Sequence, residues 1–158
     1  ENRPFRLVFV GSGQDEAEIR TRVREAGLEE RVRFMGTVVE REEMKEYYGR
    51  ADLFLFPSLY DTASLVMREA AAFSTPSVLI RGSSTAENVE DGVNGFLSDN
   101  NPASFSGVLK GLMDNPERIR IAGKGALESI YLPWEKVVDM VYSRYREIVR
   151  TFSGRERE

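Results

Sequence analysis

The feature that most constrains the fold of this chain is the alternation of short apolar runs with amphipathic helical patterns. Runs rich in β-branched, leucine and aromatic residues predict strands. These runs are Pro4–Val10, Val32–Gly36, Leu53–Phe56, Ser77–Ile80 and Gly95–Leu97. Strands that alternate with helices form βαβ units, so the sequence predicts an α/β fold with a parallel sheet covered by helices.

Apolar residues at helical spacing and helix-start signals indicate the helices. Predicted helices cover Asp15–Ala26, Met44–Ala51 and Leu65–Phe73, and three more begin at Pro102, Pro116 and Trp134. The run Leu53–Phe56 is apolar on both faces, which predicts a central strand with helices on each side. At the end of the chain, residues 153–158 are polar and are expected to form a frayed tail.

Two residue types are missing from the sequence, and their absence excludes several kinds of chemistry. The chain has no cysteine and no histidine, so it holds no disulfide, no thiolate nucleophile and no imidazole metal ligand. Its net charge of -4 gives no electrostatic reason to expect a nucleic-acid partner. The lack of cysteine fits a reducing cytoplasm.

Ligands of parallel sheets bind outside the carboxyl ends of the strands, so the loops there are candidate sites. The first such loop contains Gly11 and Gly13, but Glu16 stands where a dinucleotide-binding G-x-G-x-x-G pattern has its third glycine. Asp15 and Glu16 also add negative charge where a pyrophosphate would bind. We interpret Gly11 and Gly13 as a turn that approaches a ligand or a neighbouring loop, and not as an NAD(P) site.

The loop after Leu53–Phe56 is the most informative one. It leads into a helix whose start, Ser64, Leu65 and Val66, carries no acid, so its free N–H groups suit a diphosphate. Glu69, on the second turn, can accept paired hydrogen bonds from vicinal hydroxyls such as those of a ribose. The residues alone leave two alternatives open, in which Asp61 is only an N-cap and Glu69 only a solvated helix acid.

Residues 57–78 resemble the E-x7-E segment of group 1 (family 4) retaining glycosyltransferases with the GT-B architecture. The family pattern is P-S-x-x-E-x-F/T-G-x-x-x-x-E-A-x-A-x-G-x-P-V, and its spacing is kept with Asp61 and Glu69 as the two acids. Four other segments are similar to family motifs. They are Val8–Gly13 (v-x-x-G-x-G), Val32–Gly36 (v-x-F-x-G), Tyr48–Leu53 (y-x-x-A-D-l) and Glu87–Leu97 (E-x-v-x-d-G-x-n-G-f-l).

This resemblance implies a doubly wound, Rossmann-like parallel sheet, the carboxyl-terminal donor-binding half of a GT-B enzyme, over residues 1–152. By resemblance, the base of the donor would lie against Gly36, Thr37 and Val38. The ribose hydroxyls would bind Glu69, and the phosphates would lie at the helix start described above. Asp61 would hold hydroxyls of the transferred sugar, and none of these residues would be a general base.

The function implied by the resemblance is transfer of a hexosyl group from a nucleotide-diphospho sugar to an acceptor in polysaccharide or glycolipid biosynthesis. A UDP-sugar is the expected donor substrate, with no cofactor and no metal. The sequence contains no D-x-D motif, which disfavours the Mn²⁺-binding GT-A class. The expected location is cytoplasmic, with the parent enzyme peripheral at the inner membrane face.

Several departures from the family pattern affect the sugar end of the site. Asp61 is one methylene shorter than the usual glutamate, Ala63 and Ser64 replace a glycine-containing pair, and Gly82–Thr85 replaces a paired-glycine loop. The family's domain also begins one strand and helix earlier, with an arginine and a lysine that clamp the diphosphate. We therefore expect the chain to be inactive alone and to need the amino-terminal acceptor domain of its parent enzyme as partner. The missing strand would leave a sheet edge open to self-association.

Two other classes of function are alternatives to this one. A GT-B-like sugar-nucleotide epimerase or a phosphorylase differs in acid spacing and cofactor signature. A non-catalytic, flavodoxin-like binding module would favour an acidic cluster at the ends of two strands, which the sequence does not contain.

The two acids are expected to recognise different parts of the donor. Asp61→Asn should spare affinity for the bare nucleoside diphosphate and reduce affinity for the intact sugar donor, because Asp61 would contact only the sugar. Calorimetric titration with both ligands measures this difference, and equal losses for both would mean that Asp61 only shapes its loop.

Overall fold

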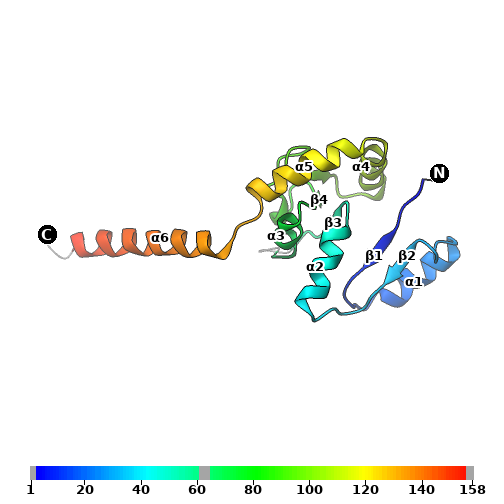
Figure 1. Ribbon diagram of the computed structural model, residues 1–158, viewed down its shortest axis with the longest axis horizontal. Helices are drawn as coiled ribbons and strands as arrows, with labels where there is room; N and C mark the ends of the chain where they lie inside the picture. Colours follow the sequence, from blue (N-terminus) through cyan, green and yellow to red (C-terminus); the bar gives the residue numbers. More distant parts are fainter. Residues whose placement is uncertain (1–2, 61–64, 156–158) are drawn as a thin grey trace. The chain divides into compact units, whose positions relative to one another are not determined.

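Figure 1 shows the computed structural model of the chain, which describes residues 3–60 and 65–155. The chain divides into two compact units, Glu1–Tyr47 and Tyr48–Glu158. Each unit has its own parallel sheet, and the division falls within a helix.

The first unit is built around one βαβ element. Its parts are β1 (Leu7–Phe9), α1 (Glu16–Glu25) and β2 (Val32–Phe34), followed by the start of α2 (Arg41–Arg50). Strands β1 and β2 are parallel, and the stacked rings of Phe9 and Phe34 have centroids 4.9 Å apart. The Arg20 guanidinium of α1 lies 4.2 Å from the centroid of the Phe34 ring, so α1 packs against this strand pair.

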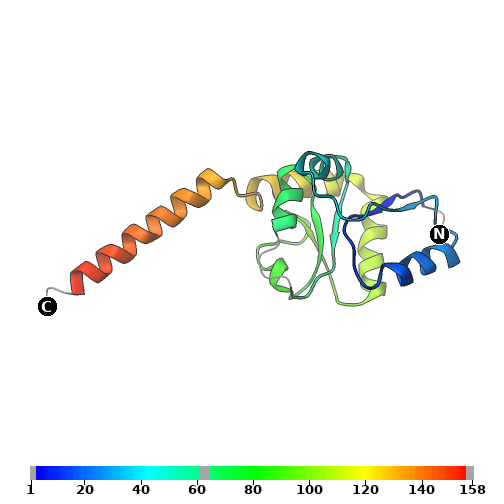
Figure 2. The same ribbon diagram turned by 90° about the horizontal axis from the view of Figure 1, so that it is seen from below.

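The second unit contains the remaining elements. They are β3 (Phe54–Phe56), α3 (Leu65–Ala72), β4 (Ser77–Ile80), the 3₁₀ helix η1 (Ser84–Ala86), β5 (Phe96–Ser98), α4 (Pro102–Asp114), α5 (Pro116–Ser129) and α6 (Trp134–Arg155). The three strands are parallel in the order β3-β4-β5. The sheet lies between helices, as the second view in Figure 2 shows.

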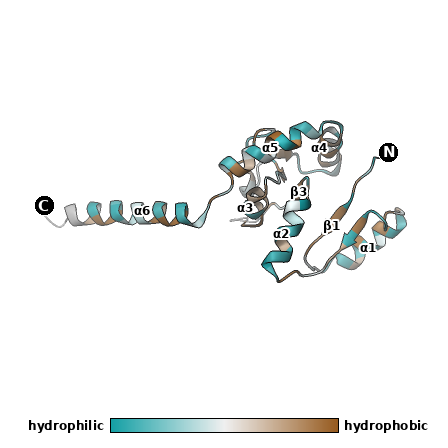
Figure 3. Ribbon diagram, viewed as in Figure 1, coloured by the Kyte–Doolittle hydropathy of each residue, from teal (hydrophilic) through white to brown (hydrophobic). Residues whose placement is uncertain are grey.

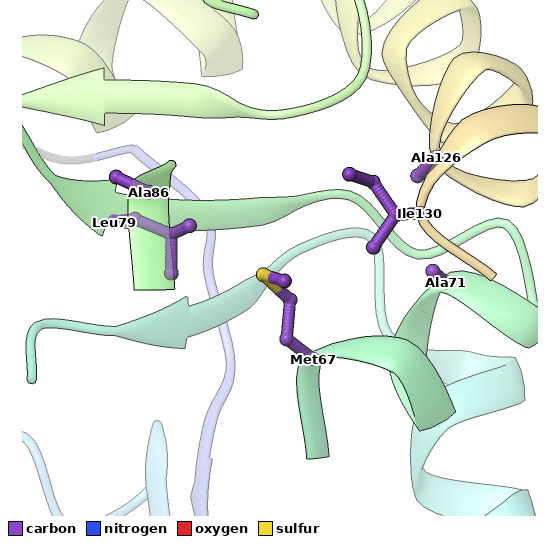
Figure 4. Close-up of a cluster of buried hydrophobic side chains, with 6 residues drawn as sticks. All are labelled: Met67, Ala71, Leu79, Ala86, Ala126 and Ile130. Carbon is purple, nitrogen blue, oxygen red and sulfur yellow. The ribbon is translucent and has the colours of Figure 1, made fainter. Parts of the chain in front are cut away.

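Strand register assigns the apolar side chains of this sheet to two faces. Leu79 pairs with Phe56 and Leu97, and these two partly buried side chains pack against the cluster of Leu79 with helix residues of α3 and α5, whose buried members Figure 4 draws. The buried members of that cluster are Met67, Ala71, Leu79, Ala86, Ala126 and Ile130. On the other face, Val78 and its neighbours pack against α4 and α5 through Leu112 and Ala122. The second unit is therefore a three-layer arrangement with a core on each face of the sheet.

The structure confirms the parallel α/β fold but corrects the position of one strand. The run Leu53–Phe56 was expected to be central, and among the described strands β3 instead lies at the edge of its sheet. The central strand is β4, whose four residues are all buried. The prediction was wrong because apolar side chains on both faces of a strand show only that helices cover both faces of the sheet. An edge strand of such a sheet is covered in the same way, so this pattern does not identify the central strand.

Local signals predicted the starts of α4 and α5. The side chain of Asn101 accepts a hydrogen bond from the Ser104 backbone N–H at 2.8 Å, which caps α4 as its Asn-Pro start predicts. Helix α5 also starts as expected after Asn115, although without a side-chain cap. Helix α6 continues to Arg155, so the first residues of the expected tail belong to its last turn.

Helix α6 is amphipathic, as the alternating colours of Figure 3 show. Its large apolar residues are exposed, with Trp134 at 76% and Tyr145 at 65% of their full accessible area. Among the described residues, no helix combines the length and the apolar character that crossing a bilayer requires.

Two backbone contacts of α5 require glycine. A Cβ on Gly123 would collide with the carbonyl oxygen of Ser74, and one on Gly125 with that of Val93. Ser74 itself has a left-handed φ of 59°, a conformation that favours glycine, and the family pattern has glycine at this position. Helix α5 therefore packs directly against the turns that follow α3 and precede β5.

Replacement of Gly123 tests this close approach. We expect Gly123→Ala to lower the free energy of unfolding by about 1–3 kcal/mol, because the new methyl group overpacks a backbone contact. Gly107→Ala on α4 is the matched control, since its Cβ would meet nothing within 4 Å. The control should gain roughly 0.5–1 kcal/mol from helix propensity alone. Urea unfolding of both variants decides, and a stabilised Gly123→Ala would contradict the contact.

Candidate functional site

In the first unit, the loops that follow β1 and β2 lie side by side. The Gly11 N–H donates a 2.7 Å hydrogen bond to the carbonyl oxygen of Gly36, and the hydroxyls of Ser12 and Thr37 are 3.2 Å apart. Gly11 has φ of 119° and Gly36 of 69°, so both positions favour glycine. The expected turn that approaches a neighbouring loop is confirmed.

These two loops present mostly backbone and small side chains at the surface. Gly11, Gly13 and Thr37 are exposed, and Gly36 and Val38 are half-buried. The acids that follow are paired along α1, Glu16 with Arg20 at 2.8 Å and Glu18 with Arg22 at 2.6 Å. Assignment of these loops to a nucleotide base stays a prediction.

In the second unit, the candidate site centres on Glu69 of α3. Its carboxylate is exposed, and its Oε2 accepts a 3.2 Å hydrogen bond from the hydroxyl of Tyr48. Leu65 and Val66 form the start of α3, and Leu65 is 66% exposed. The described first turn of α3 holds no acid, in agreement with the sequence analysis, and its Arg68 donates to the carbonyl oxygen of Ile130 at 3.1 Å.

Tyr48 is a buried residue whose hydroxyl reaches this exposed acid. Its ring packs edge-on against Phe54 and is stacked with Phe73, at centroid distances of 5.9 and 6.4 Å. Burial raises the pKa of the Tyr48 phenol well above its ordinary value of 10.0, and the charge and hydrogen bond of Glu69 raise it further. The phenol therefore stays protonated and acts as a hydrogen-bond donor.

An open hollow of about 450 Å³ lies at the carboxyl ends of the strands in this unit. It is lined by Leu59 after β3, by residues of the Gly82–Glu87 loop after β4, and by Leu97 of β5. Gly82 has φ of 80°, and the buried hydroxyl of Ser83 donates to the Ile80 carbonyl oxygen at 2.8 Å. The loop that departs from the family's paired glycines is thus held by internal hydrogen bonds.

Two polar residues of the Glu87–Leu97 motif have a structural role. The Asn94 side chain accepts from the Glu90 N–H at 2.8 Å and donates to the Ser129 hydroxyl at 2.9 Å. Asp91 accepts from the Leu97 N–H at 3.1 Å. These contacts fold the segment before β5 and tie it to α5.

Two of the predicted site residues, Asp61 and Ser64, lie outside the described residues. In the sequence, Tyr48 belongs to a helical pattern and to a motif, and neither connects it with Glu69. The signal that could have identified it is its place as the first residue of the y-x-x-A-D-l motif. Within the described ranges, no cluster of three or more acids could hold a metal ion.

Comparison with known proteins relates the chain to one family. The family described as "Glycosyl transferases group 1" matches residues 1–115. D-inositol 3-phosphate glycosyltransferase 1 of Catenulispora acidiphila is 30% identical over 156 residues, which cover 94% of this chain and 37% of that protein.

Solved structures share the fold. Sucrose-phosphate synthase from Thermosynechococcus elongatus matches with a TM-score of 0.78 and 26% identity over 92% of this chain and 39% of that one. Anabaena Alr3699/HepE in complex with UDP matches with a TM-score of 0.71 and 20% identity over 95% of this chain and 41% of that one. The chain thus spans about two fifths of the length of these proteins.

The raised pKa of Tyr48 predicts a loss of stability in alkali. Above about pH 10 the unfolded phenol releases its proton while the native phenol keeps it, so stability falls as the pH rises. This loss is up to about 1.4 kcal/mol per pH unit for one group. Tyr48→Phe should therefore show a smaller fall in unfolding free energy between about pH 9 and pH 11. Urea titrations at both pH values test this, and equal falls in the two proteins would contradict it.

Proposed function

The chain belongs to the group 1 glycosyltransferases, and we propose that it binds the nucleotide-diphospho-sugar donor of a retaining hexosyl transfer. The proposal places the nucleotide base against Gly36, Thr37 and Val38, where two glycine turns leave the backbone accessible. It places the ribose on Glu69. Two of the similar proteins, sucrose-phosphate synthase and D-inositol 3-phosphate glycosyltransferase, are named for different molecules, so the proposal names the donor and no acceptor.

The observation that carries this proposal is the position of the Glu69 carboxylate. It is exposed on the helix that follows the carboxyl end of β3, and a neutral phenol fixes one of its oxygens. A carboxylate that accepts one hydrogen bond from a neutral donor can still accept hydrogen bonds from two vicinal hydroxyls. The start of α3, with no acid in its described first turn, is a favourable place for the adjacent diphosphate.

In this mechanism the protein contributes geometry and charge stabilisation. Asp61 would hold hydroxyls of the transferred sugar, and the N–H groups at Ser64–Val66 would face the diphosphate as negative charge develops on it. The bond between the sugar and the diphosphate would break as the bond to the acceptor oxygen forms, and the departing diphosphate would take the proton that the acceptor hydroxyl loses. Alignment of the reacting groups and preorganised dipoles supply the rate acceleration, with no general base among these residues.

The proposal includes the setting of this reaction. UDP is the proposed nucleotide, a choice supported by the UDP complex of the structurally similar Alr3699/HepE, and no metal or cofactor is proposed. An acceptor-binding domain of the same enzyme is the proposed partner, in a cytoplasmic enzyme of polysaccharide or glycolipid biosynthesis that lies at the inner membrane face. The outer edge of β3 is the proposed place of self-association, since no described strand pairs there.

Removal of the Glu69 carboxylate tests the function. Glu69→Ala should weaken nucleoside diphosphate binding by roughly 1.5–3 kcal/mol, the usual range for hydrogen bonds to a charged group. Unfolding free energy should change little, because the carboxylate is exposed. Glu128→Ala removes an exposed acid of α5 and serves as the control with unchanged affinity. Calorimetric titration measures both, and equal affinities of Glu69→Ala and the control would refute the ribose assignment.

A further inference from the structure

The Tyr48–Glu69 hydrogen bond joins two residues of different helices that lie far apart in the sequence. Several described acids pair with a cation on the same helix, as Glu42 does with Lys45 at 2.6 Å and Glu147 with Arg144 at 2.6 Å. Glu69 instead accepts from a neutral phenol 21 residues away on another helix. Such long-range contacts depend on tertiary packing, so the bond reports how Tyr48 and α3 are held within the second unit.

The donor is fixed more firmly than the acceptor. Tyr48 has only 6% of its surface exposed, and its ring contacts Phe54 and Phe73. Its backbone carbonyl oxygen accepts a 2.7 Å hydrogen bond from the buried hydroxyl of Thr75. Both ends of the residue are therefore anchored, and the hydroxyl has a defined position at the surface beside Glu69.

We propose that Tyr48 is a positioning residue for ribose recognition, because its hydroxyl holds Oε2 of Glu69 and leaves Oε1 directed to the ligand hydroxyls. This inference rests on the proposed function, and it names the Tyr48 hydroxyl as the group that orients the Glu69 carboxylate. Among the residues that the structure describes, Oε1 of Glu69 has no hydrogen-bond partner. Tyr48 touches the carboxylate and not the nucleotide.

A neutral donor suits this task better than a cation. An arginine partner would engage both carboxylate oxygens and offset their charge, as Arg120 does with Glu117 through two hydrogen bonds. The phenol occupies one oxygen and leaves the negative charge in place, and its raised pKa keeps it protonated. A glutamate side chain also loses rotamer entropy when it binds a ligand. A carboxylate that is already held by a hydrogen bond loses less, so the binding free energy is more favourable.

The experiment compares a nucleoside diphosphate with its 2′,3′-dideoxy analogue. The tightest binder among UDP, GDP and ADP is titrated calorimetrically into the chain, and then its dideoxy form. We expect Tyr48→Phe to weaken binding of the hydroxylated nucleotide about three- to tenfold, the usual worth of one hydrogen bond, and to leave the dideoxy form unaffected. The phenylalanine retains the ring contacts, so a merely structural role would change both affinities alike.

Tyr47→Phe is the matched control for the loss of a tyrosine hydroxyl. Tyr47 precedes Tyr48 on the same helix, and its hydroxyl also contacts a glutamate, Glu43, at 3.4 Å. This variant should bind both nucleotides as the unsubstituted chain does. Equal affinity losses for the two nucleotides in Tyr48→Phe would overturn the positioning role.

Combination with Glu69→Gln separates this inference from the proposed function. If Tyr48 acts through Glu69, Tyr48→Phe should have no further effect on nucleotide affinity in the Glu69→Gln background. An additive loss would overturn the inference while the ribose assignment stands. If the unsubstituted chain binds none of the three nucleotides, or binds both forms equally, the proposed function fails and the inference with it.

Discussion

Strand β4 is buried along its whole length, and this burial determines the organisation of the second unit. Alternate side chains of a strand point to opposite faces of the sheet, so the buried Val78 and Leu79 pack against different sets of apolar side chains. Helix α5 contributes to both, through Ala122 on one face and Ala126 on the other. A helix that contacts the cores on both faces of the sheet must lie close to the turns beside it. The glycines of α5 permit this close approach to the backbone of Ser74 and Val93.

The polar residues around this sheet are of two kinds. Asp91, Asn94 and the buried hydroxyl of Ser83 have partners within the protein, and they shape the loops around β4 and β5. A buried polar group without a partner would cost stability, so the internal hydrogen bonds of Asn94 and Ser83 are explained by folding alone. Glu69 is exposed and keeps an oxygen available, which favours a role in ligand binding.

Rigid support of an exposed acid is the physical link between fold and proposed function. The ring of Tyr48 is held by aromatic contacts within the second unit. Its hydroxyl donates to the Glu69 carboxylate and so restricts the position of that carboxylate. Binding sites gain affinity when their groups are ordered before the ligand arrives. In the first unit, the hydrogen bond between the Gly11 and Gly36 loops has the corresponding effect on the backbone that we assign to the base.

Features that depend on neighbouring residues were predictable from the sequence. These include the bounds of β4, the Asn-Pro start of α4 and the turn at Gly11, whereas the turn at Gly36 was predicted as the end of a strand. The central position of β4 in place of β3, and the hydrogen bond between Tyr48 and Glu69, became visible only in the folded protein. Periodicity, caps and glycine report local conformation, whereas strand order and a hydrogen bond across 21 residues depend on how whole elements pack.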